Sequence, residues 1–207
     1  TKAKLTATQT FYEFKCGNVM LNLTFTSPLL LDELEIVARP ASYITFSTTS
    51  LDKKKHDIKL TFNVGNELVV NNPEQIVSSK NIETQHLKGF SVGSKDQNIL
   101  GQKGDNVRID WGYLYVVTPS QCTFSVKNEE QIAKNTSNGL TTTLENGKDF
   151  HLILAYDDLY SVQYFKQNLR AWWRRDPSMT AEKMLEMAET DYTRLMKKCA
   201  DFDKKIF

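Results

Sequence analysis

The chain has 207 residues, which fits one large domain or one domain with a helical appendage, and its 26 basic and 25 acidic residues give a formal net charge of +1. Hydrophobic residues make up 40% of the chain and charged residues 25%, which is typical of a protein with a packed core rather than a disordered one. The balanced charge argues against a nucleic-acid partner, and no apolar run approaches the roughly 20 residues that a membrane-spanning helix needs.

Most of the chain before residue 159 shows the two-residue period of β-strands. In residues 19–25 and 58–64, apolar side chains alternate with mainly polar ones, which predicts strands with one buried and one solvent-facing side. β-Branched and aromatic residues predict strands in five further segments, namely 10–15, 43–49, 68–71, 122–126 and 150–156. Many short strands at close spacing indicate a mainly β fold, an antiparallel β-sandwich over residues 1–158.

Turn residues separate the predicted strands. Cys16-Gly17-Asn18 predicts a compact hairpin between the first two of them. Residues 135–139 and 144–149 each contain an Asn-Gly pair, and we expect a turn at both places.

The pattern changes after the predicted sandwich, and we expect residues 159–207 to form two helical segments that separate near Pro177. In the second segment apolar residues recur at spacings of three and four, which predicts a helix face made of Met184, Ala188, Tyr192, Leu195, Cys199 and Phe202. Thr180 suits the N-cap position, and Glu182 lies in the first turn, where the helix dipole favours an acid. This face either folds back on the sandwich or packs against something that follows.

The segment GQKGDNVRIDWGYLYVV, residues 101–117, contains the first candidate site. Its glycine spacing does not match the phosphate-binding pattern G-x-x-x-x-G-K-[ST], and a strand rather than a helix is expected to follow. Asp105 and Asp110 are candidates for an acid–base or metal-binding pair, although their spacing alone does not bring the carboxylates together. The favoured interpretation is a structural loop that leads into a strand, with Gly112 marking a bulge or the close approach of another backbone.

Trp111, Tyr113 and Tyr115 share one face of the strand predicted at the end of this segment. One interpretation is an exposed aromatic row that stacks on sugar rings or docks another domain. The opposite face is apolar as well, because it carries Leu114 and Val116. We therefore favour an inner strand that is buried on both faces.

Asp157 and Asp158 lie at the end of a predicted strand, where binding loops are often found. Neighbouring residues of a strand point to opposite faces, so these two carboxylates make a poor catalytic pair. The favoured role is to cap the entry into a helix.

Trp172 and Trp173 lie among three arginines between residues 170 and 175. Tryptophan and arginine are enriched at the centres of protein interfaces. Together with Tyr164, these tryptophans are the candidates for contact with another domain. A nucleic-acid patch is the alternative, but the basic run is short and the rest of the chain is balanced.

The residues give no catalytic, cofactor-binding or metal-binding constellation. The three histidines, His56, His86 and His151, lie far apart, and no GxSxG or HxxxH motif is present. The three cysteines have no zinc-type spacing, and we expect them to be buried free thiols, with one disulfide and a leftover thiol as the alternative. We therefore assign no catalytic residue, no cofactor and no metal.

Three stretches, RPASY, GDNVRIDWGYLY and AYDD, resemble the N-terminal region of the glutaminase A-like proteins. The resemblance continues through AYDDLYSVQYFKQNLRAWWRRD and TDYTRLMKKCADFD, in the same order as in that family. It implies a β-sandwich region that precedes a large helical, α/α-toroid-like domain with the hydrolytic site, in proteins that are generally secreted or periplasmic. No catalytic residue of the family maps onto this chain.

By this resemblance the chain is a non-catalytic accessory domain of an enzyme that hydrolyses L-glutamine to L-glutamate and ammonia. Residues 159–207 lead towards the helical catalytic domain, which is the expected partner, and glutamine is a ligand of the whole enzyme only. Two alternatives stay open. One is a carbohydrate-binding or glycoside-hydrolase-associated module that uses Trp111, Tyr113 and Tyr115, and the other is an interaction or adhesion sandwich without an enzymatic parent.

Overall fold

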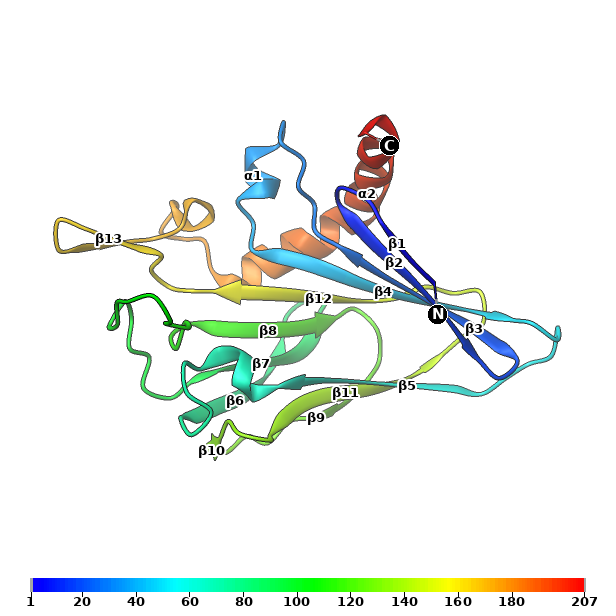
Figure 1. Cartoon of the computed structure of the whole chain (residues 1–207), viewed down its shortest axis with the longest axis horizontal. Coiled ribbons are helices and arrows are strands. Elements are labelled where there is room, and N and C mark those ends of the chain that lie inside the picture. Colours follow the sequence, from blue (N-terminus) through cyan, green and yellow to red (C-terminus); the bar gives the residue numbers. More distant parts are fainter. Residues whose placement is uncertain (1, 207) are drawn as a thin grey trace.

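The computed structural model describes residues 2–206 and has three layers (Figure 1). A nine-stranded sheet lies in the middle, a three-stranded sheet faces one side of it, and a long C-terminal helix crosses its other side. Every strand pair in both sheets is antiparallel. The predicted mainly β fold, an antiparallel sandwich followed by a C-terminal helix, is confirmed.

The elements have the following bounds. The large sheet has the order β1 (Lys2–Leu5), β2 (Gln9–Cys16), β3 (Val19–Thr26), β4 (Ala41–Ser50), β12 (Phe150–Asp157), β8 (Tyr113–Thr118), β7 (Lys88–Ser94), β6 (Ile76–Glu83) and β10 (Gln131–Ile132). The small sheet has the order β5 (Ile58–Gly65), β11 (Ser137–Leu144) and β9 (Thr123–Ser125). The helices are α1 (Leu34–Val37) and α2 (Ala181–Ile206), with 3₁₀ turns η1 (Asn66–Val69) and η2 (Trp172–Arg174). A separate hairpin consists of β13 (Val162–Tyr164) and β14 (Gln167–Leu169).

The large sheet is buried on both faces along its central strand β12. Phe150 and Leu152 point towards the small sheet, whereas Ile153 and Ala155 point towards α2. The core between the two sheets also contains Ile44, Phe46, Val64, Phe90, Val116, Leu140 and Leu144. Because alternate residues of a strand point to opposite sides, both alternating sets of β12 must be apolar, and the sequence FHLILAY meets this requirement.

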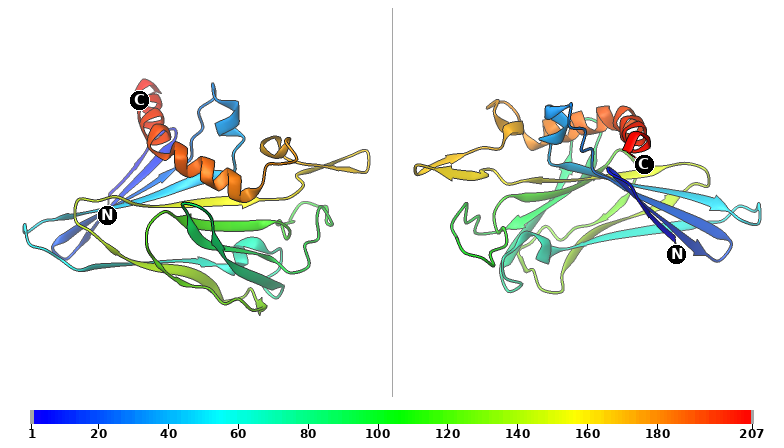
Figure 2. Two further views of the ribbon diagram at one scale, coloured as in Figure 1. Left: turned by 180° about the vertical axis from the view of Figure 1, so that it is seen from behind. Right: turned by 45° about the horizontal axis from the view of Figure 1, so that its top comes forward.

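Helix α2 begins as its sequence predicts. The Thr180 hydroxyl accepts a hydrogen bond from the backbone N–H of Lys183, with 3.2 Å between the two atoms, which is the geometry of an N-cap. Glu182 lies in the first turn. The predicted apolar face packs on the large sheet through Met184, Ala188, Tyr192, Leu195, Cys199 and Phe202. Of the two orientations that the sequence left open, the structure shows the helix folded back on the sandwich (Figure 2).

The prediction of a first helical segment before Pro177 is wrong, because residues 162–169 form the β13–β14 hairpin and η2 follows it. The strands have three residues each, too few to show a two-residue period. Phe165 and Lys166 make the turn with φ values of 45° and 64°, in the left-handed region that turns usually fill with glycine or asparagine. The sequence therefore carries no recognisable turn signal at this place.

Three smaller expectations also fail. None of residues 68–71 lies in a strand, since Leu68 and Val69 belong to η1, and the Asn-Gly pair expected in a turn at 135–139 lies inside β11. There Asn138 is buried and donates hydrogen bonds of 2.8 Å to Asn66 Oδ1 and Ser79 Oγ, so a polar residue pairs within the core. All three cysteines are free, but only Cys199 is buried, while Cys122 is half-buried and Cys16 is exposed.

No helix within residues 2–206 is long and apolar enough to cross a membrane.

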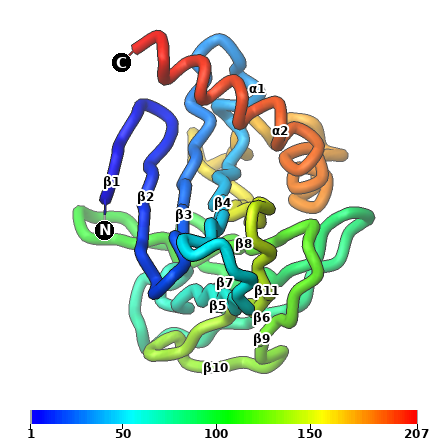
Figure 3. The backbone as a smooth tube through the Cα atoms, turned by 90° about the vertical axis from the view of Figure 1, so that its right-hand side faces the viewer, coloured from blue at the N-terminus to red at the C-terminus, as the bar shows by residue number. Residues whose placement is uncertain are grey.

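The C-terminal end of α2 is anchored to the turn between β1 and β2, which lies beside it in Figure 3. One Asp203 carboxylate oxygen accepts hydrogen bonds from the hydroxyls of Thr6 at 2.6 Å and Thr8 at 2.9 Å. Its other oxygen accepts one from the Thr8 backbone N–H at 2.9 Å. Asp203 is only 6% exposed, so these bonds replace its hydration and fix the edge of the sheet to the helix.

We expect Asp203→Ala to lower the free energy of unfolding by about 2 kcal/mol, because it leaves the buried Thr8 N–H without an acceptor. Asp201→Ala on the same helix is the matched control. Asp201 forms only surface ion pairs with Lys197 and Lys204, and its loss should change stability by less than about 0.5 kcal/mol. Urea unfolding of both variants measures the difference, and equal losses would contradict the anchoring role of Asp203.

Candidate functional site

Most of the predicted site residues gather where β12 ends. Asp157, the last residue of β12, is 1% exposed and forms an ion pair of 2.5 Å with Arg174 of η2. Its other carboxylate oxygen accepts a hydrogen bond from the Leu159 backbone N–H at 3.0 Å. Asp157 therefore caps the turn that leaves the strand and ties that turn to η2. The predicted role as a cap for the entry into a helix is wrong, because a hairpin follows instead.

Burial raises the pKa of the Asp157 carboxyl above its ordinary value of 3.8, against the opposing influence of the Leu159 N–H and of Arg174. Asp158 carries a second negative charge next to it and raises the same pKa. A carboxyl with a raised pKa at the end of a strand is compatible with a role as a catalytic acid or base. Here, however, both oxygens of Asp157 are occupied by structural partners, so the carboxylate holds the turn.

The carboxylates of Asp105 and Asp110 occupy different environments and form no pair. Asp105 is exposed, whereas Asp110 is completely buried. One Asp110 oxygen accepts hydrogen bonds from the side-chain amides of Gln75 at 3.1 Å and Gln102 at 3.3 Å. The favoured interpretation of this segment as a structural loop fits these contacts.

Trp111 and Gly112 attach this loop to the end of β12. The Trp111 indole donates to the Tyr160 carbonyl at 3.1 Å, and the Tyr156 hydroxyl donates to the Trp111 carbonyl at 2.5 Å. Gly112 has φ +80°, and a Cβ atom there would lie 2.2 Å from the Asp157 carbonyl oxygen. The predicted close approach of another backbone at Gly112 is thus confirmed.

The aromatic row of Trp111, Tyr113 and Tyr115 is not an exposed platform. Strand β8 begins only at Tyr113, so Trp111 lies in the preceding loop. Tyr113 and Tyr115 point towards α2, and Leu114 and Val116 point towards the small sheet. The prediction that both faces of this strand are buried is confirmed, and the row offers no flat aromatic surface for a sugar ring.

The β13–β14 hairpin with its turn, residues 162–169, projects from the body of the molecule, and we call it the arm (Figure 2). All six of its strand residues are exposed. Phe165 at the tip is 83% exposed and Tyr164 is 62% exposed, and their rings meet edge to face with 4.5 Å between centroids. The candidate Tyr164 therefore lies on a protruding surface rather than in a pocket.

The two tryptophans at the base of the arm have different environments. Trp173 is 7% exposed and packs in the core beneath α2, whereas Trp172 is 51% exposed. The Arg175 guanidinium lies 4.3 Å from the centre of the Trp172 ring and forms an ion pair of 2.5 Å with Glu35 of α1. Of the two, only Trp172 is available for a partner.

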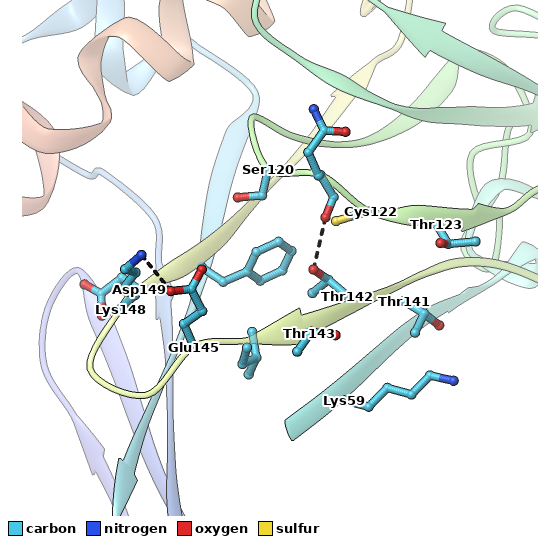
Figure 4. A pocket seen from close by; sticks show the side chains of 13 residues that line it. Lys59, Ser120, Cys122, Thr123, Thr141, Thr142, Thr143, Glu145, Lys148 and Asp149 are labelled. Atoms are coloured by element: carbon cyan, nitrogen blue, oxygen red, sulfur yellow. Dashed lines mark hydrogen bonds and ion pairs between the residues drawn. The ribbon is translucent and has the colours of Figure 1, made fainter. Parts of the chain in front are cut away.

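An open depression of about 950 Å³ lies beside β11, shown in Figure 4. Five of its thirteen lining residues carry hydroxyl side chains, and Cys122 lies on its wall. Burial raises the pKa of the Cys122 thiol, which disfavours the reactive thiolate, and no histidine lines the pocket. Glu145 and Lys148 at its edge form an ion pair of 2.6 Å with each other. This arrangement gives no nucleophile with an adjacent base.

Each of the three histidines forms a pair with a carboxylate. The ring-to-carboxylate distances are 2.7 Å for His56 and Asp52, 2.7 Å for His86 and Glu186, and 2.8 Å for His151 and Glu189. Within residues 2–206 no three His, Cys, Asp or Glu side chains cluster as metal ligands do. The arm, which the sequence did not predict, is the feature with the clearest signal of interaction.

We expect Arg174→Met to lower the free energy of unfolding by about 3 kcal/mol at pH 7, because it leaves the buried Asp157 without its cation. The pKa of Asp157 is higher in the folded protein than its ordinary 3.8, so its protonated form favours folding; this contribution is complete below about pH 3.8 and is lost as the pH rises through the folded pKa. Removing Arg174 raises the folded pKa further. The deficit of the variant should therefore be smaller at pH 4 than at pH 7.

The neighbouring variant Arg175→Met is the control, since it removes an exposed ion pair and should cost no more than about 1 kcal/mol. Adding Asp157→Asn to Arg174→Met should recover part of the loss. Chemical unfolding at both pH values measures these differences, and a deficit of Arg174→Met that does not depend on pH would contradict the account.

The comparisons with known proteins place the chain in one family. The model of a family described as "Domain of unknown function (DUF5127)" matches residues 8–146 and 135–207. No curated protein matches the chain. Because the two matched ranges together extend from residue 8 to residue 207, the chain belongs to the DUF5127 family.

Proposed function

We propose that this chain is the N-terminal accessory domain of a glutaminase-like amidohydrolase, and that it docks on a helical catalytic domain of the same polypeptide. The whole enzyme would hydrolyse the side-chain amide of L-glutamine, and the resemblance of the sequence to glutaminase A-like proteins supports this substrate. The same resemblance supports a secreted or periplasmic location. The docking part of the proposal has support from the surface of the domain.

The single observation that carries the docking role is the exposed arm. A two-stranded hairpin with no further strand or helix against it is at best marginally stable in water. The arm has only three residues in each strand, and its apolar side chains, Val162, Tyr164, Phe165 and Leu169, are all more than 40% exposed. Burial of these side chains against a partner would stabilise both the hairpin and the complex.

The turn at the tip of the arm adds to this argument. An aromatic residue in the left-handed region costs of the order of 1 kcal/mol relative to glycine or asparagine. Phe165 nevertheless occupies such a position, where its ring packs edge to face on Tyr164. Glycine would adopt this backbone conformation at the lowest cost. The presence of Phe165 there is explained if its ring enters a recess of the partner.

A second exposed apolar segment lies next to the base of the arm. Leu29, Leu31 and Leu34, before and within α1, are 51%, 80% and 58% exposed. Ion pairs hold this segment in place, from Glu33 to Arg194 and Lys198 of α2 and from Glu35 to Arg175. The domain thus presents two apolar surfaces on a fixed frame, as a docked accessory domain requires.

The first test of this proposal compares ammonia release from L-glutamine by this chain and by the same chain extended through the sequence that follows it in its gene. We expect release only from the extended protein. Release from the chain alone would contradict the accessory role, and a folded extended protein without activity would contradict the glutaminase assignment.

The second test replaces the tip of the arm by the double substitution Tyr164→Ser and Phe165→Ser. The chain alone should keep its free energy of unfolding to within about 0.5 kcal/mol, because both side chains are exposed. The extended protein should lose about 2 kcal/mol or more, because the same side chains would be buried there. Leu5→Ser, at the 74% exposed residue of the edge strand β1, is the control and should be neutral in both proteins. Neutrality of the arm substitutions in the extended protein would exclude docking through the arm.

A further inference from the structure

A small pocket opens where β12 leaves the large sheet, at the base of the arm. It has a volume of about 360 Å³ and is formed by five segments of the chain, through Ala38, Pro40, Leu68, Ile109, Tyr156, Asp158, Ala171 and Trp173. Nearly all of these side chains are apolar, and the size suits one amino-acid side chain or one small ligand. It is separate from the arm tip, on which the docking proposal depends.

Two polar side chains line this pocket, and their situations differ. The Tyr156 hydroxyl is already committed, because it donates to the Trp111 carbonyl. Burial raises the pKa of Tyr156, and the negative charge of Asp158 raises it further, so this group stays neutral. Asp158 is half-buried, and within residues 2–206 its carboxylate has no ion-pair or hydrogen-bond partner. Among the described residues that line the pocket, only Asp158 is charged, and its carboxylate has no partner.

Two arginines at the base of the arm, Arg174 and Arg175, have partners other than Asp158. Arg174 forms its ion pair with Asp157, and its guanidinium lies 5.0 Å from the centre of the Trp173 ring. Arg175 pairs with Glu35. The half-buried carboxylate of Asp158 is therefore available to a cation that enters the apolar recess.

We propose that this pocket binds a cationic group on an aliphatic stem, an ammonium or a guanidinium. The apolar lining accommodates the methylene groups of such a ligand, and the carboxylate of Asp158 accepts a charge-assisted hydrogen bond from its head. An anionic ligand would be repelled by Asp158, and a neutral donor such as a hydroxyl would form a weaker hydrogen bond because it carries no charge. The cation comes either from a free amine or from a lysine or arginine side chain of a protein partner.

The test uses n-butylammonium as the probe and n-butanol as its neutral counterpart of similar shape. Binding is followed by the methyl resonances of Ala38, Leu68 and Ala171 in NMR titrations of the chain. We expect butylammonium to bind about tenfold more tightly than butanol, because a hydrogen bond to a charged group adds that much. Asp158→Asn should remove the preference. It should keep the fold, because the Asp158 side chain makes no hydrogen bond in the structure.

Asp105→Asn is the matched control. It removes the same charge at Asp105, an exposed residue that does not line the pocket. It should therefore leave the preference for butylammonium intact. Equal binding of the two probes by the unaltered chain would overturn the proposal. So would a preference that survives Asp158→Asn, or one that Asp105→Asn abolishes to the same extent.

A third probe, lysine blocked at its α-amino and carboxyl groups, distinguishes the two sources of the cation. If it binds at least as tightly as butylammonium, the pocket takes a side chain of a protein partner. If butylammonium binds and the blocked lysine is excluded, the pocket takes a free amine. Both results support a cation-binding pocket, and failure of the glutaminase assay would leave either of them unchanged.

Discussion

The burial of β12 on both faces is the constraint on which the rest of this structure depends. Leu152 packs on the small sheet and Ile153 packs beneath α2, so one strand belongs to two cores at once. The helix is therefore a third layer of the domain rather than an appendage. The end of the same strand then fixes the loop before β8, through Gly112 against the Asp157 backbone, and fixes η2, through Arg174. The base of the arm takes its position from these contacts.

The strands and the helix that the sequence predicts are those whose pattern of apolar and polar side chains matches their burial. The apolar periods of β5 and α2 are regular because each packs one continuous face against the large sheet. The apolar character of both faces of β12 and β8 likewise predicts inner strands. The sequence does not predict strand β11, because Asn138-Gly139 is a pair typical of turns. In the structure the buried Asn138 side-chain amide donates to Asn66 and Ser79 instead. No local pattern encodes that long-range pairing.

The arm shows a different limit of sequence interpretation. The aromatic and arginine composition of the arm and of the residues that follow it predicts an interface at Tyr164, Trp172 and Trp173, whereas the predicted helix at the arm is wrong. The error has a physical origin, since the three-residue strands make few contacts and the turn at Phe165 lacks glycine or asparagine. The composition fits the docking role that we propose for the arm, and local propensity does not resolve its secondary structure. Composition also does not separate the two tryptophans, because Trp172 is exposed whereas Trp173 belongs to the core.

The central claim is that the arm is a docking element for a further domain of the same polypeptide. Amide hydrogen exchange of residues 162–169 tests it most directly, because a hairpin without a partner opens readily and one buried in an interface does not. The account predicts fast exchange in this chain and strong protection in the chain extended through the sequence that follows it, with β12 protected in both. Equally fast exchange of the arm in the two proteins, with β12 protected as expected, would contradict it.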